Sequence, residues 1–91
     1  SVYSSSKSSL LGFSNSLAKE YGRFNITSNI ISLGYFDSPM WNRLNNIKKR
    51  KLLCDVPSKK IGKISNIIKA INFIKNSEYL NGSNIKLDGG I

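Results

Sequence analysis

The chain has 91 residues, with 14 Lys and Arg against 5 Asp and Glu, a net charge of +9. This length allows one small domain at most, too little for a cofactor domain and a substrate domain together. The absence of His removes imidazole from catalysis and metal binding, and a single Cys excludes an internal disulfide and a Cys-based zinc site. No apolar run reaches the roughly 18–20 residues of a membrane span, and the Ser-rich start has no apolar signal core. We therefore expect a cytoplasmic protein.

The positive charge fits either a nucleic-acid surface or a compositional bias toward Lys, Asn, Ile and Ser. A nucleic-acid module needs its charge on one stripe, with exposed aromatic side chains between the basic ones. Here the aromatic residues fall mostly on apolar faces, and the lysines are spread over several segments. We expect neither nucleic acid nor a membrane as partner.

Hydrophobic spacing predicts the order helix, strand, helix, helix, strand. The expected elements are a helix over 3–22, a strand over 26–32, a loop over 33–38, a lid over 39–58 that opens with a helix from Pro39 to about Leu53, a helix over 64–76 and a strand over 84–87.

Local signals mark some of these boundaries. Gly22 is placed to end the first helix as a C-cap residue. Ser38 before Pro39 is a good N-cap for the lid helix, since proline suits the first helical position. Gly12 costs about 1 kcal/mol relative to alanine inside a helix, so we expect a close helix contact there.

The strand pattern indicates part of a domain. The apolar residues of 26–32 do not alternate, which suits a strand buried on both faces of a parallel sheet. Two strands do not make a sheet able to bury these helices, whose clearest apolar stripe is the isoleucine series of 64–74. We expect the back half of an α/β domain.

The sharpest chemical feature is Tyr3-Ser4-Ser5-Ser6-Lys7. Residues four apart at the start of a helix share one face. A lysine ammonium beside a tyrosine stabilises the phenolate and lowers the phenol pKa, so the pair can exchange a proton with a substrate oxygen near neutral pH. Tyr-x-x-x-Lys is also common by chance, so the spacing alone leaves an ordinary helix as the alternative.

The wider sequence resembles the short-chain dehydrogenase/reductase family, and within it the 3-oxoacyl-carrier-protein-reductase-like group. The stretch 3–14 resembles the active-site helix of that family, and 26–31 the buried strand that follows it. Residues 33–38 stand where the family has a Pro-Gly loop ending in Thr. The stretch 80–90 resembles its C-terminal strand and Asp-Gly-Gly ending. These stretches occur in family order and cover nearly the whole chain.

The resemblance implies the C-terminal half of a Rossmann-type doubly wound parallel sheet. It implies an oxidoreductase that uses NAD or NADP to interconvert a carbonyl and an alcohol by hydride transfer, on a small-molecule or carrier-bound substrate. A homodimer or homotetramer is implied as well, with the helix 3–22 and the last strand at subunit contacts. The implied site residues are Tyr3 as acid/base, Lys7 on the cofactor ribose, Gly34, Phe36 and Ser38 on the nicotinamide side of the cofactor, and Met40, Trp41 and Leu44 as a lid over the substrate.

Some features depart from the family pattern. Leu33 replaces the usual proline, which puts the stiffness of the loop in doubt, whereas Ser38 keeps the hydroxyl of threonine. The glycine-rich phosphate loop and the catalytic Asn and Ser lie upstream in the family, so we expect these 91 residues to be inactive alone. The alternative is a truncated, non-catalytic remnant that acts only as an interaction module.

Three other features keep two interpretations each. Trp41 either grips substrate in the lid or covers an edge of the core. The basic run Lys48–Lys51 either attracts an acidic carrier or a phosphate-bearing substrate, or is a solvated helix face. Cys54 fits a small apolar filler better than a nucleophile, because no His is present to activate it.

Overall fold

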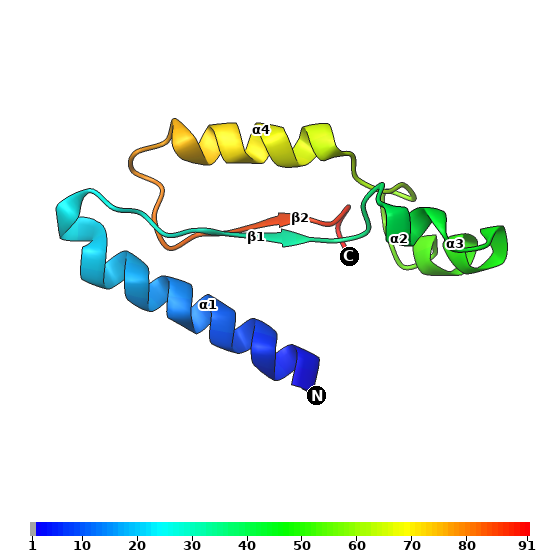
Figure 1. Cartoon of the computed structure of the whole chain (residues 1–91), viewed down its shortest axis with the longest axis horizontal. Coiled ribbons are helices and arrows are strands. Elements are labelled where there is room, and N and C mark those ends of the chain that lie inside the picture. The colour runs from blue at the N-terminus through cyan, green and yellow to red at the C-terminus, as the bar shows by residue number, and fades with distance from the viewer. Residues whose placement is uncertain (1) are drawn as a thin grey trace. The chain divides into compact units, whose positions relative to one another are not determined.

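The structure is a computed structural model that describes residues 2–91, with side chains from residue 5 onward. The chain divides into two compact units, described separately below: the first unit is Ser1–Ile31 with Asn72–Ile85, and the second unit is Ser32–Ile71 with Lys86–Ile91. The elements in chain order are α1 (Val2–Tyr21), a 3-10 turn (Gly22–Phe24), β1 (Ile30–Leu33), α2 (Pro39–Asn42), α3 (Asn46–Leu53), α4 (Ile64–Lys75) and β2 (Asn84–Leu87) (Figure 1).

The two strands form a parallel pair. In the first unit the Ile30 amide donates to the Ser83 carbonyl at 2.8 Å, and in the second unit the Gly34 amide donates to the Leu87 carbonyl at 2.9 Å. Residue numbers rise together on both strands, which is the register of a parallel ladder. Parallel strands connected through helices confirm the α/β class.

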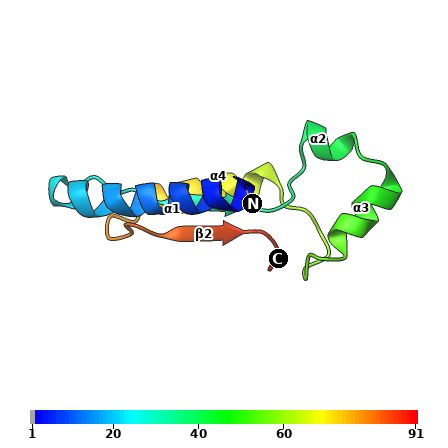
Figure 2. The same cartoon turned by 90° about the horizontal axis from the view of Figure 1, so that it is seen from below.

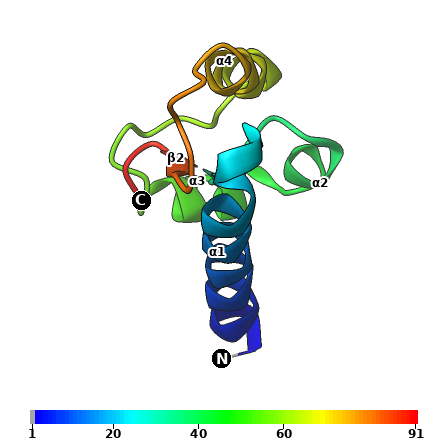
Figure 3. The same cartoon turned by 90° about the vertical axis from the view of Figure 1, so that its left-hand side faces the viewer.

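In the first unit, α1 ends one residue before the predicted boundary and runs into the 3-10 turn (Figure 3). The prediction that Gly22 caps this helix is wrong, because Gly22 begins the 3-10 turn. The left-handed residue is Asn25, with φ 62°, and its amide donates to the Gly22 carbonyl. Asparagine tolerates this conformation better than most residues. A Cβ on Gly12 would meet no atom within 4 Å among the described residues, so the expected close helix contact is not found there.

Side-chain amides join distant segments of the first unit. Asn81 accepts from the Ser28 amide at 3.0 Å and donates to the Ala18 carbonyl at 3.0 Å. Asn29 donates to the Leu80 carbonyl at 3.2 Å and accepts from the Ser83 amide at 3.0 Å. These bonds satisfy backbone groups that a sheet ladder would otherwise pair. The strand predicted over 26–32 therefore begins only at residue 30, and it is half-buried rather than buried on both faces.

In the second unit the predicted lid helix is divided into α2 and α3 (Figure 2). Ser38 caps α2 as expected, since its hydroxyl oxygen accepts from the Trp41 amide at 3.2 Å. Asn45 then caps α3 by accepting from the Lys48 amide at 2.8 Å. Because the Asn45 side chain bonds to a free amide in the first turn of α3, it favours a new helix start at this point. This explains why α2 and α3 are separate helices.

Close contacts with glycines hold the second unit together. A Cβ on Gly34 would lie 2.8 Å from the Cα of Asp88, and a Cβ on Gly62 would lie 2.5 Å from the ring of Phe36. Gly89 has φ 67°, and a Cβ there would meet Ser58 and Val56. Each glycine therefore allows two segments to approach more closely than any other residue would permit.

The helix α4 begins at Ile64 as predicted and ends one residue before the predicted boundary, while β2 has the predicted bounds. Asn66 starts α4 by accepting from the Lys63 amide at 2.9 Å. Its isoleucine stripe is largely uncovered in the described residues, since the side chain of Ile68 is 52% exposed and that of Ile71 is 51% exposed. Two strands present too little surface to cover it. Within residues 2–91, no helix combines the length and apolarity needed to cross a membrane.

Candidate functional site

Tyr3 and Lys7 lie in the first turns of α1 in the first unit. The backbone of both residues is helical, so the spacing places them on one face of α1. The side chain of Tyr3 lies outside the described residues, and that of Lys7 is exposed. The Tyr–Lys pair therefore stays a prediction.

The second unit contains the loop that follows β1, with Phe36 at its centre. Phe36 forms a parallel bridge with Gly62: the Gly62 amide donates to the Tyr35 carbonyl at 2.8 Å, and the Asp37 amide donates to the Gly62 carbonyl at 3.0 Å. The bridge uses backbone groups of the residues on either side, so the N–H and C=O of Phe36 itself take no part in it. Within residues 2–91 neither group has a hydrogen-bond partner.

This pair of free groups has a definite chemical character. One residue offers a donor and an acceptor next to each other, and a primary carboxamide offers the complementary acceptor and donor. Backbone groups without a protein partner are matched by water or by a ligand. The backbone of Phe36 therefore fits a planar amide.

Gly34 directly follows β1, and its backbone is not in the left-handed region that only glycine adopts easily. It is required because the backbone of Asp88 approaches it closely. Gly34 thus fixes the start of the loop against the end of β2.

Ser38 ends the loop, and its hydroxyl oxygen already takes part in one hydrogen bond within the protein. Its Oγ accepts from the Trp41 amide, and this bond caps α2. A hydroxyl also carries one proton to donate and a second lone pair. Ser38 therefore keeps a hydroxyl proton for a ligand while it caps α2.

The three predicted lid residues differ in exposure. Met40 is 76% exposed, Leu44 is half-buried, and Trp41 is only 8% exposed. The ring of Trp41 lies against that of Tyr35, with centroids 5.7 Å apart and a 36° tilt. Of the two interpretations of Trp41, burial against the protein is the one the structure favours.

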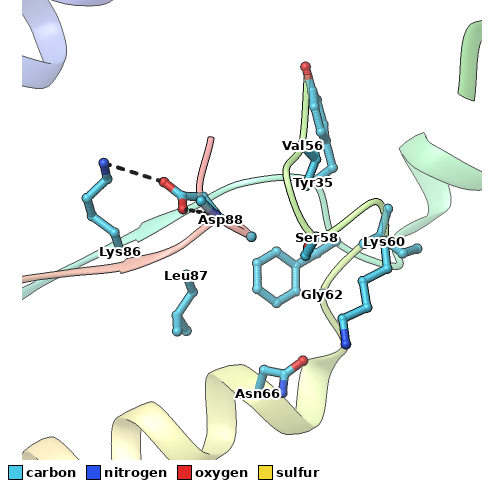
Figure 4. Close-up of a pocket in the computed structure, with 13 residues that line it drawn as sticks. Tyr35, Val56, Ser58, Lys60, Gly62, Asn66, Lys86, Leu87 and Asp88 are labelled. Carbon is cyan, nitrogen blue, oxygen red and sulfur yellow. Dashed lines mark hydrogen bonds and ion pairs between the residues drawn. The ribbon is translucent and has the colours of Figure 1, made fainter. Parts of the chain in front are cut away.

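A pocket of about 550 Å³ lies in the second unit, with Phe36 among its lining residues. Figure 4 shows this pocket in close-up. Its walls combine apolar side chains such as Val56 and Leu87 with polar ones such as Lys60 and Asn66. The Lys86 ammonium lies 3.9 Å from the Asp88 carboxylate at its edge, as the dashed line in Figure 4 shows. Of the eight predicted site residues only Phe36 lines this pocket. The pocket and the expected cofactor contacts therefore share Phe36 and otherwise use different residues of the second unit.

The second unit thus contains six of the eight predicted residues in one continuous segment, and α1 carries the other two. Sequence reasoning missed Tyr35, the ring partner of Trp41, and the tie between Asn42 and Asp37, whose side chains are 3.3 Å apart. The contact of the Phe36 ring with Gly62 was missed as well. The only signal for it in the sequence is a glycine in an otherwise polar connection.

Comparison with known proteins gives matches along the whole chain. The profile of a family described as enoyl-(acyl carrier protein) reductase matches residues 1–91. Among the relatives, the chain is 36% identical to 3-oxoacyl-(acyl-carrier-protein) reductase FabG of Buchnera aphidicola (subsp. Acyrthosiphon pisum) and 32% identical to nodulation protein G of Rhizobium sp. (strain N33). It is 29% identical to 3-oxoacyl-(acyl-carrier-protein) reductase MabA of Mycobacterium bovis.

Each of these three alignments covers 98% of this chain and 37% of the relative. The chain therefore spans little more than a third of the length of the curated relatives it matches. The parallel strands, the loop after β1 and the profile match over every residue lead to one assignment. The chain belongs to the short-chain dehydrogenase/reductase family of oxidoreductases, in its 3-oxoacyl-carrier-protein-reductase-like group.

Proposed function

We propose that the whole protein is an NAD(P)-dependent reductase that interconverts a carbonyl and an alcohol, and that this chain supplies its acid/base pair and its nicotinamide-side loop. The observation that carries the proposal is the backbone of Phe36, whose N–H and C=O are free of protein partners in the described residues. The nicotinamide carboxamide has the complementary groups. When bound, the cofactor supplies or accepts the hydride.

Each site residue of this chain has its own role in binding the cofactor or transferring the proton. Phe36 orients the carboxamide through its backbone, and Ser38 donates its hydroxyl proton on the same side. Gly34 lets the loop start close to Asp88, which holds it still. Tyr3 gives a proton to the substrate oxygen in reduction and takes it in oxidation. Lys7 lowers the pKa of the Tyr3 phenol and binds the ribose hydroxyls.

For the substrate we propose a 3-oxoacyl thioester on a carrier. The support is that two of the relatives described above are 3-oxoacyl-(acyl-carrier-protein) reductases. The side chain of Met40 on α2 is 76% exposed, and in this proposal it meets the apolar acyl chain.

We also propose a homodimer or homotetramer. On α1, Leu10 is 56% exposed and Phe13 is 62% exposed, and such apolar groups favour contact with a second surface. The proposal includes α1 and β2 as contact elements. The mass of the whole protein, measured by light scattering, distinguishes these states from a monomer.

The decisive variant is Tyr3→Phe in the whole protein, because it removes only the hydroxyl. We expect kcat to fall by about 10²–10⁴-fold, the range that one acid/base group contributes, with cofactor affinity within twofold. Tyr21→Phe is the matched control, since Tyr21 lies at the other end of α1. Turnover is measured as cofactor absorbance with acetoacetyl-coenzyme A, and cofactor affinity by calorimetry.

Two results would count against the proposal. Wild-type turnover in Tyr3→Phe would remove Tyr3 from the chemistry. A wild-type protein that binds neither NADH nor NADPH would end the enzymatic proposal and favour an interaction module.

A further inference from the structure

The first lid helix, α2, is too short to hold its position alone. It has four residues, whereas isolated helices shorter than about 12–15 residues are marginal in water. The Ser38 cap satisfies one of its amides but does not fix its direction. Its position is therefore decided by the segment to which its side chains are attached.

That segment is the loop after β1. The rings of Tyr35 and Trp41 are in contact, and Asn42 donates from Nδ2 to Oδ1 of Asp37 at 3.3 Å. Tyr35 and Asp37 stand on either side of Phe36, whose ring lies against Gly62 instead. Tyr35 and Asp37 therefore contact α2, while the ring of Phe36 between them packs on Gly62 in the connection that precedes α4.

Burial separates two neighbours on α2. Trp41 is 8% exposed, so its ring has almost no surface left for a substrate, while Met40 is 76% exposed. A tilted pair of rings at this centroid distance is a favourable aromatic arrangement. Trp41 is therefore used for attachment, and Met40 is the side chain left free.

We propose that Tyr35 and Trp41 form an aromatic clasp that fixes α2 to the loop, so that Trp41 is a positioning residue and Met40 the lid residue that meets the substrate. The clasp rests on the proposed function, which assigns the backbone between Tyr35 and Asp37 to the cofactor carboxamide. Any displacement of Phe36 on cofactor binding is passed to Tyr35 and Asp37 and through them to α2. Cofactor binding thus fixes the position of α2 before the substrate binds.

The contact itself is tested without cofactor. Trp41 is the single Trp of this chain, and the difference in emission between the wild type and Trp41→Phe isolates it in the whole protein. We expect acrylamide to quench this emission weakly, because the ring is buried. Tyr35→Leu should raise the quenching constant at least twofold, and Tyr35→Phe, which keeps a ring, should restore the low value.

A second experiment tests the positioning role. In Tyr35→Leu we expect the KM for acetoacetyl-coenzyme A to rise about two- to tenfold, the range an aromatic pair of this geometry is worth, with kcat within twofold. Saturating NADPH or NADH should change the Trp41 emission of the wild type, and this change should be lost in Tyr35→Leu. Tyr79→Leu is the matched control, because Tyr79 is fully exposed in the first unit and belongs to no ring pair among the described residues.

The outcomes separate the two proposals. Unchanged quenching and unchanged KM in Tyr35→Leu would overturn the clasp while leaving the reductase intact. Cofactor binding seen by calorimetry with no change in Trp41 emission would overturn the coupling to the lid. Absence of any cofactor binding by calorimetry would overturn the proposed function, and the positioning role with it, even where quenching shows the ring contact. If Tyr35→Leu fails to fold, Trp41→Leu takes its place in the KM measurement.

Discussion

Different kinds of contact stabilise the interior of each of the two units. In the first unit, Asn29 and Asn81 each bridge backbone groups more than 50 residues away through a side-chain amide. In the second unit, glycines allow backbone and rings to approach closely, as at Gly34 and Gly62. Hydrogen bonds from a side chain adjust to small shifts, whereas a steric contact of this kind does not.

The difference bears on function. The proposed loop contacts lie in the second unit, where the position of a backbone group has to be correct for a ligand amide. Close packing on glycine fixes such a group without using its own hydrogen bonds. The amide bridges of the first unit use backbone groups of Ala18 and Ser28, which leaves the start of α1 outside this network.

The largest change in stability should come from Gly34→Ala. The added Cβ would lie 2.8 Å from the Cα of Asp88, so the backbone must move and the bond from the Gly34 amide to Leu87 must weaken. We expect a loss of about 1–3 kcal/mol in the free energy of unfolding, measured by urea denaturation of the whole protein. A variant as stable as the wild type would contradict the steric account of the second unit.

A smaller loss is expected from Asn81→Ala in the first unit. Two hydrogen bonds disappear, each worth about 0.5–1.5 kcal/mol. Because the bond from Ser28 is exposed to water, we expect the lower part of the summed range, about 1–2 kcal/mol. Asn81→Asp keeps the acceptor for the Ser28 amide and removes the donor to Ala18, which separates the two bonds. The same denaturation assay applies, and equal stability of Asn81→Ala and wild type would show that the bridge contributes nothing.

The smallest effect, of opposite sign, should come from Gly12→Ala. Apart from the nearby backbone of α1 itself, no described atom lies within 4 Å of the added Cβ, and alanine is the better helix former, so we expect a gain of about 0.5–1 kcal/mol. This variant makes the same chemical change as Gly34→Ala. A loss of stability instead would indicate that another surface packs on α1 at Gly12, as the sequence first suggested.

Local signals in the sequence predicted several elements well. The alternation of polar and apolar residues over 84–87 predicted the bounds of β2, and Ser38 with Pro39 predicted the start of α2. Both features depend on residues next to each other in the chain. The α/β class followed from the same patterns together with the resemblance to a family.

Features that depend on distant residues were not predictable from pattern alone. The strand 26–32 is shortened because Ser28 and Asn29 bond to residues near 80, which no local signal records. The lid helix breaks because Asn45 acts as a cap rather than as a polar residue on a helix face. The partner of Trp41 is Tyr35, at a spacing that is not characteristic of any element.

The central claim is that the backbone of Phe36 binds the carboxamide of a nicotinamide cofactor. A crystal structure of the whole protein with NADPH or NADH tests it most directly. The account predicts the carboxamide within about 3 Å of both the N–H and the C=O of Phe36, with the Ser38 hydroxyl on the same side. A carboxamide bound elsewhere, with those two groups paired to water or protein, would contradict it.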